Sequence, residues 1–309
     1  MFPRLLQLFE ASMLLLAAVG LLRLRPVLRH TTLTTVWPWA WVAWTAAVVG
    51  WVLRMAGSTA LVSYMDYFTA VAVLSPPLAS LGARRPTCRT WPFFVLLPMF
   101  AVLCWPALSV GLATRFARPL ELETPAMVMY VVVLIMAMGN YAFGRLGRSV
   151  VIFSLLLAGQ VSGWSEHLLF FWPPEFQRFF PQAIAVLLIF GFHQVAESEF
   201  DSMFDAAYND PEDRFDATLR EFGELYGLVW WLRLQDRLNV FASQQKWPVR
   251  FEGRLCNWTE PVTESQRAEI ERAFRWLLRR FVDPPWLDAR LPSPGTPVAK
   301  EAFTSPIDS

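Results

Sequence analysis

Charged residues are scarce in this sequence. Asp, Glu, Lys and Arg make up 17% of its 309 residues, whereas roughly 25% is usual for soluble globular domains. Hydrophobic residues account for 55% and aromatic residues for 15%, and the mean hydropathy is positive. This composition argues against an ordinary soluble domain and favours a membrane protein.

Cysteine and histidine are equally sparse and carry no motif. The sequence has no CxxC pair and no Cys/His cluster, which argues against a disulfide framework and against a zinc site. It also lacks a Walker loop, GxGxxG after a strand, HExxH and GxSxG. We therefore expect no metal and no catalytic residue, and we prefer the hypothesis of a protein that is not an enzyme. The six residues concerned are Cys88, Cys104, Cys256, His30, His167 and His193.

Lysine is almost absent, with 2 Lys against 25 Arg, which is typical of a GC-rich bacterial genome. The net charge of +1 hides an asymmetry, because residues 1–195 carry a net charge of +7 and residues 196–309 carry −6. The basic residues of the first part lie in short loops, and the second part is acidic overall. Neither part resembles a nucleic-acid-binding surface, so no nucleic-acid partner is expected.

Long apolar runs predict an all-α, polytopic transmembrane helical bundle of about seven spans. A helix that crosses the hydrocarbon core needs about 20 mostly apolar residues. Six spans remain possible if one of the last two, short runs only dips into the bilayer. The predicted spans are residues 5–22, 34–54, 58–81, 91–113, 125–144, 149–165 and 179–196.

The distribution of arginine predicts an N-out/C-in orientation. The loops after the first, third and fifth spans hold 8 Arg, and the opposite side holds 5. Because cytoplasmic loops carry the excess of Lys and Arg, the C-terminal part is expected in the cytoplasm. We therefore predict an integral protein of the bacterial cytoplasmic (inner) membrane.

The chain divides into four predicted segments. Residues 1–196 form the helical bundle, and residues 197–213 form an acidic juxtamembrane linker. Residues 214–285 form a small C-terminal cytoplasmic unit of amphipathic helices, and residues 286–309, rich in Pro, Ser and Thr, are expected to be a disordered tail. A unit of this size is only marginally stable by itself, so it is expected to dock on the membrane part or on a partner.

Within the C-terminal unit, apolar residues recur at helical spacing over about 214–245, and the helix ends before Pro248. Alternation in the "VRFE" stretch that follows indicates a short strand or hairpin. Thr263 and Gln266 form a capping box that opens a second helix. The stretch "YGLVWWL" is apolar all round and must be buried on more than one side. The partner-interface candidates are therefore Tyr226, Trp230, Trp231 and Leu234.

Asp66 is an ionisable residue inside the third predicted span, a position that is costly and usually faces the bundle interior. Thr59, Ser63, Asp66 and Ala70 share one helical face. Candidates at similar depth are Thr45 and Gln160, and no basic residue is expected to reach Asp66. Two interpretations stay open: a proton or ligand site, or a hydrogen-bonded group that holds helices together.

His193 lies near the inner end of the last predicted span. A histidine at this depth could ligate haem, contact a quinone or titrate near neutral pH. His30 and His167 lie at other depths, which disfavours haem bound by two histidines. No cofactor is predicted, and haem and quinone remain open.

The preferred functional hypothesis is a non-enzymatic integral membrane scaffold or accessory subunit. Its cytoplasmic helical unit would bind or stabilise a partner protein complex, in the lipid bilayer and next to other membrane or cytoplasmic proteins. One alternative is a membrane carrier or a lipid- or quinone-handling protein that uses Asp66 and His193. Another is a membrane sensor that signals through the cytoplasmic helices.

Overall fold

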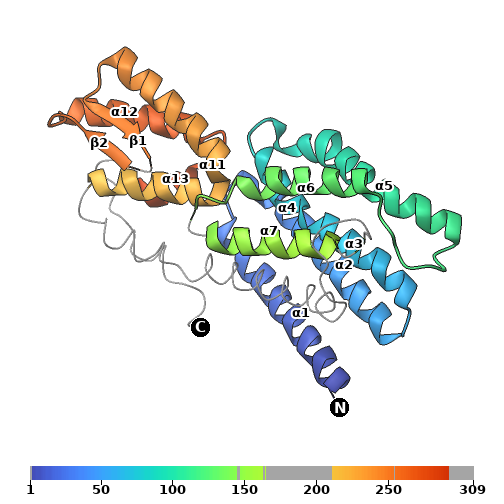
Figure 1. Ribbon diagram of the computed structural model, residues 1–309. Helices are drawn as coiled ribbons and strands as arrows, with labels where there is room; N and C mark the ends of the chain where they lie inside the picture. Colours follow the sequence, from blue (N-terminus) through green and yellow to red (C-terminus); the bar gives the residue numbers. More distant parts are fainter. Residues whose placement is uncertain (1, 145–146, 163, 165–210, 254, 292–309) are drawn as a thin grey trace. The chain divides into compact units, whose positions relative to one another are not determined.

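The structure, a computed structural model, describes residues 2–144, 147–162, 164, 211–253 and 255–291 (Figure 1). The described part is mostly helical, which confirms the predicted fold class at that level. The chain forms two compact units. The N-terminal unit comprises residues 1–27, 33–83 and 87–196. The C-terminal unit comprises residues 197–309 together with two short segments, 28–32 and 84–86.

Helices make up the described part of the N-terminal unit. Three short helical turns, η1 (Thr32–Thr35), η2 (Thr87–Arg89) and η3 (Pro92–Leu96), connect or precede longer ones. The longer helices are α1 (Phe2–Val27), α2 (Trp37–Met55), α3 (Thr59–Val73), α4 (Ser75–Leu81), α5 (Leu97–Thr114), α6 (Thr124–Gly139) and α7 (Gly147–Ser162).

Three helical stretches of the described chain are long and apolar enough to cross a membrane: Gln7–Val27, Thr32–Met55 and Pro92–Thr114. They correspond to the predicted spans 5–22, 34–54 and 91–113. Two further apolar helices, Thr124–Gly139 and Ser149–Val161, are shorter. A seven-span bundle is therefore not confirmed. The predicted span 179–196 lies outside the described residues.

The third predicted span, 58–81, is not one continuous helix. It breaks at Leu74 into α3 and the seven-residue α4, which starts with Ser75 followed by two prolines. Proline lacks the N–H that would continue the helical ladder, and its ring clashes with the preceding turn. The 15 residues of α3 extend about 22 Å, which is less than the thickness of a hydrocarbon core.

Tyrosines connect the helices inside the N-terminal unit. The hydroxyl of Tyr67 on α3 donates to the carbonyl of Leu103 on α5 at 2.6 Å, and that of Tyr130 on α6 donates to Ala70 at 3.0 Å. Large apolar side chains, in contrast, lie outside. Leu15, Trp105 and Ile135 are each about two-thirds exposed. Such extensive apolar surface is unusual for a soluble monomer and suits a lipid environment.

The described part of the C-terminal unit contains three helices and one hairpin. The strands pair antiparallel, with Arg250 opposite Asn257. Gly227 interrupts α11 with a φ of +77°, a left-handed conformation that glycine adopts without strain. The elements are α11 (Pro211–Gln245), β1 (Val249–Glu252), β2 (Leu255–Trp258), α12 (Glu264–Leu278) and α13 (Pro284–Arg290).

Two predictions for this unit are confirmed and two are corrected. The hairpin is present, and Thr263 and Gln266 form the capping box that opens α12. The hairpin means that the chain is not strictly all-α. Residues 286–291 do not belong to a disordered tail, because α13 starts at Pro284 and Trp286 and Leu287 are 3% and 1% exposed. Prolines in a first turn suit the start of a helix, where their missing N–H has no intrahelical partner to lose.

Candidate functional site

Asp66 has a cationic partner in the structure. The Nη1 of Arg54, in the last turn of α2, donates to Asp66 Oδ1 at 2.6 Å, and Arg54 Nε lies 3.7 Å from Glu10 Oε2 on α1. The expectation that no basic residue reaches Asp66 is therefore wrong. A tight turn between α2 and α3 runs the helices antiparallel and places Arg54 beside an aspartate twelve positions later.

The three charged groups link three helices. Glu10 is 8% exposed. Gly50 on α2 lies next to Asp66, and a Cβ atom at Gly50 would be 3.4 Å from Asp66 Oδ1. A charge that leaves water needs a close partner to repay the cost of desolvation. Arg54 supplies that partner to both carboxylates, and this contact supports the interpretation of Asp66 as a group that holds helices together.

The other residues proposed around Asp66 make different contacts. Thr45 Oγ1 donates to the carbonyl of Trp41 in its own helix, at 2.8 Å. Gln160 is buried on α7, and its Oε1 has no hydrogen-bond partner within the described part of the chain. Ser63 accepts a hydrogen bond from the Leu120 N–H at 2.8 Å. The predicted polar cluster of Asp66, Thr45 and Gln160 is therefore not joined by hydrogen bonds.

His193 lies outside the described residues, as does His167. Among the residues that the structure does describe, no group of three or more His, Cys, Asp or Glu side chains is placed to hold a metal ion. The three cysteines are free thiols.

The four partner-interface candidates on α11 lie in the interior of the C-terminal unit. Tyr226, Trp230, Trp231 and Leu234 are 0%, 6%, 3% and 4% exposed. Tyr226 and Trp230 pack on the ring of Phe281, with centroids 5.2 and 5.1 Å away. The four candidates are thus buried by the unit itself, whereas Val229 and Leu232 of the same stretch are 36% and 53% exposed. A partner surface on this unit has to use residues other than the four candidates.

Two short segments that connect helices of the N-terminal unit belong to the C-terminal unit. Residues 28–32 follow α1, and residues 84–86 lie between α4 and η2. Main-chain hydrogen bonds join both segments to the end of α12 and the residues after it. These bonds run from Thr32 N–H to Phe281 O (2.7 Å), from Asp283 N–H to His30 O (2.7 Å) and from Arg85 N–H to Arg280 O (2.8 Å).

Tyr226 adds a buried side-chain contact to this junction. Its hydroxyl donates to the carbonyl of Phe281 at 2.7 Å and lies 3.1 Å from Thr32 Oγ1. Burial raises the pKa of Tyr226, so the neutral hydroxyl persists across the physiological range. Sequence reasoning missed the junction, because main-chain contacts between distant segments leave no residue pattern.

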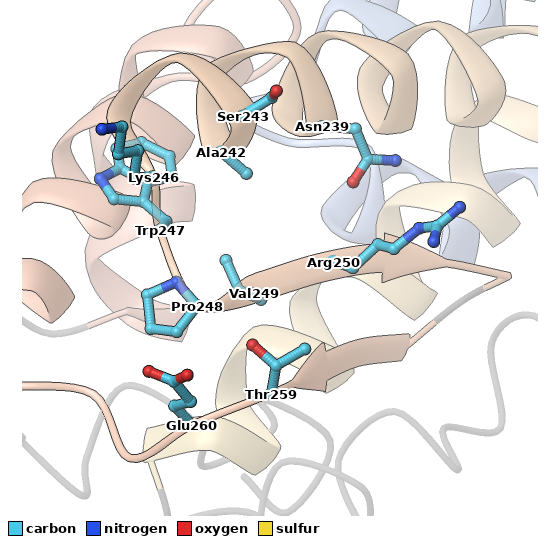
Figure 2. A pocket seen from close by; sticks show the side chains of 10 residues that line it. All are labelled: Asn239, Ala242, Ser243, Lys246, Trp247, Pro248, Val249, Arg250, Thr259 and Glu260. Carbon is cyan, nitrogen blue, oxygen red and sulfur yellow. The ribbon is translucent and has the colours of Figure 1, made fainter.

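A groove of about 530 Å³ lies between the end of α11 and the hairpin. Figure 2 shows α11 residues on one side of it and hairpin residues on the other. Apolar parts of Trp247, Pro248 and Val249 combine there with the charged groups of Lys246, Arg250 and Glu260. The complete lining is Asn239, Ala242, Ser243, Lys246, Trp247, Pro248, Val249, Arg250, Thr259 and Glu260.

Comparisons with protein-family models, with curated proteins and with solved structures give no match to this chain.

Proposed function

We propose that this chain is a multi-pass membrane scaffold or accessory subunit, without catalytic activity, whose C-terminal unit binds a partner protein. The main observation behind the proposal is the junction of the C-terminal unit with residues 28–32 and 84–86. Three main-chain hydrogen bonds and the Tyr226 contacts hold a folded, largely polar unit on two inter-helix segments. A unit held in this way suits the presentation of a binding surface at the membrane.

The same junction supports the proposed topology. Residues 28–31 separate the candidate spans Gln7–Val27 and Thr32–Met55, and residues 84–86 precede the candidate span Pro92–Thr114 by a few residues. We propose that segments so close to the ends of candidate spans lie at a membrane surface. The arginine bias of these segments favours the cytoplasmic side for that surface.

The groove between α11 and the hairpin is the proposed partner site. It offers the apolar area of Trp247, Pro248 and Val249 together with polar and charged side chains, and protein interfaces likewise combine an apolar core with a polar rim. The proposal needs no cofactor, and it assigns Asp66 a structural role. A carrier that used Asp66 would have to break its contact with Arg54.

Filling the groove is expected to abolish partner binding. Ser243 is exposed and lines the groove, so Ser243→Trp places an indole in it without disturbing the core. We expect the amount of partner that stays bound to the full-length, gently solubilised protein to fall roughly tenfold or more. The reason is that residues at the centre of an interface carry most of the binding energy, and the indole would block that centre. Quantitative mass spectrometry of the co-purified proteins measures the loss.

Gln244→Trp is the matched control, because Gln244 is the next residue of the same helix, is exposed and does not line the groove. A protein counts as a specific partner if it co-purifies with the wild type and with the Gln244→Trp variant but not with the Ser243→Trp variant. That protein, once purified, must also bind the reconstituted wild-type chain. Equal retention by all three chains would remove the groove from the proposal.

A further inference from the structure

A positively charged surface lies on the C-terminal unit, formed by Arg84, Arg233, Arg237 and Arg280 together with Trp276; we call it the basic face. Arg233 and Arg237 are one turn apart on the exposed side of α11. Trp276 lies in the last turn of α12, Arg280 follows that helix by two residues, and Arg84 belongs to segment 84–86. The basic face therefore unites three parts of one unit.

Aromatic contacts fix the positions of these arginines. The guanidinium carbons of Arg84 and Arg233 lie 6.0 and 5.0 Å from the centre of the same Trp230 ring. That of Arg280 lies 5.1 Å from the centre of the Trp276 ring. Two guanidinium groups that share one indole are held close together although their charges repel.

The electrostatics confirm that positive charge is concentrated here. Burial, and then the charges of Arg280, Arg233 and Arg237, lower the pKa of Arg84. Within the described part of the chain, no carboxylate lies at ion-pair distance from Arg233, Arg237 or Arg280. Asp236 lies three residues after Arg233 on the same side of α11, but its carboxylate is not within ion-pair distance of that arginine. In the described part of the chain, Arg233, Arg237 and Arg280 together therefore outnumber the acidic side chains beside them.

Trp276 gives the basic face an amphipathic character. Its side chain is 52% exposed, a large fraction for a tryptophan, and it packs against Phe241 on one side. Tryptophan beside arginine is the combination found where proteins contact the interface between lipid headgroups and hydrocarbon.

We propose that the basic face binds the anionic lipid headgroups of the membrane that holds the chain. Charge complementarity favours a phosphate-bearing partner, since guanidinium groups pair with phosphate oxygens. The location favours lipid as the source, because Arg84 lies only eight residues before the candidate span Pro92–Thr114 and segment 28–32 joins two other candidate spans. A membrane surface is thus already close to this unit.

Photo-crosslinking in the full-length chain tests the contact. A photoreactive phenylalanine analogue replaces Trp276 or, as the control, the exposed Glu264, which lies more than three turns earlier on α12 and about 120° around the helix. The protein is reconstituted in vesicles of phosphatidylcholine with an equal amount of phosphatidylglycerol. We expect a phosphatidylglycerol adduct at position 276 and little or none at 264. The absence of a lipid adduct at position 276 would overturn the proposal. The same crosslinking is done in intact cells, and adducts there with an acidic protein alone would also overturn it.

Charge neutralisation provides an independent readout. A basic residue near an anionic surface contributes a roughly fivefold increase in binding. Crosslinking at position 276 is measured in vesicles with increasing fractions of phosphatidylglycerol. The fraction that gives half-maximal crosslinking should be roughly fivefold higher for Arg237→Gln than for the wild type. Arg118→Gln, at an exposed arginine that the proposed topology places on the opposite side of the membrane, should leave it unchanged. The same curve for Arg237→Gln and wild type would contradict the assignment of the arginines.

Soluble glycerophosphate distinguishes the two possible sources of phosphate. It carries the headgroup's phosphate chemistry but no acyl chain. The crosslink to phosphatidylglycerol should persist in its presence, because the membrane keeps its own headgroups concentrated at the face. Complete displacement of the crosslink by glycerophosphate would show a site for a soluble phosphate compound and would overturn the lipid assignment.

Discussion

Arg54→Gln is expected to destabilise the N-terminal unit by about 2 kcal/mol, which is less than the cost of breaking a fully buried ion pair, because the Arg54–Asp66 pair is partly buried. Arg54 is the cation between Glu10 and Asp66, at 3.7 and 2.6 Å. Its loss leaves two carboxylates without their shared partner on three helices that pack together. Thermal unfolding of the purified chain in detergent, followed by its helical signal, measures the effect.

Asp66→Asn is the matched comparison for that experiment. It keeps the size of the side chain and leaves Arg54 paired with Glu10, so one positive and one negative charge remain. We expect a loss of no more than about 1 kcal/mol. If Asp66→Asn costs as much as Arg54→Gln, or if it removes a cellular activity while the fold stays intact, Asp66 is not a structural residue.

Arg290→Met is the second change with a large expected effect. Arg290 at the end of α13 makes a bidentate contact with the carboxylate of Glu221 on α11, whose side chain is 3% exposed. Removing the arginine takes the bidentate contact from a buried carboxylate, at an expected cost of about 3 kcal/mol in the C-terminal unit. Amide hydrogen exchange of α11 and α13 in the full-length protein measures the loss of local stability.

The double variant Glu221→Leu, Arg290→Met provides the control. It removes both charges, and buried ion pairs can often be replaced by apolar residues of similar volume with little loss. We expect it to recover most of the protection that Arg290→Met loses. If the double variant is no more stable than Arg290→Met alone, packing by the arginine stem, and not charge, holds α13 in place.

Local patterns in the sequence were sufficient for many elements. The period of apolar residues located α11 and α12, and the spacing of Thr263 and Gln266 identified the start of α12. These features depend on residues within one or two turns of each other. The span predicted over 58–81 is not one continuous helix, because the two prolines after Ser75 interrupt the helical ladder between α3 and α4.

Contacts between distant residues were not predictable in the same way. Arg54 is the last residue of the predicted span 34–54, and only the packing of α2 against α3 places it beside Asp66. The interior of the C-terminal unit shows the same limit. The "YGLVWWL" stretch predicted burial on more than one side, whereas Trp230 and Trp231 are buried by their own unit and Val229 and Leu232 are exposed. Alanine at position 230 or 231 would therefore test folding before it tested partner binding.

The sidedness of five positions tests the central claim most directly. In a background without the native cysteines, single cysteines replace the exposed residues Arg29, Thr87 and Arg272, and also Ala56 and Arg118. A membrane-impermeant thiol reagent is applied to sealed vesicles of known orientation. The first three cysteines should react only from the cytoplasmic side, and the last two only from the opposite side. A cysteine at 272 that reacts from the side opposite to the cysteine at 29 would contradict a C-terminal unit joined to the cytoplasmic segments.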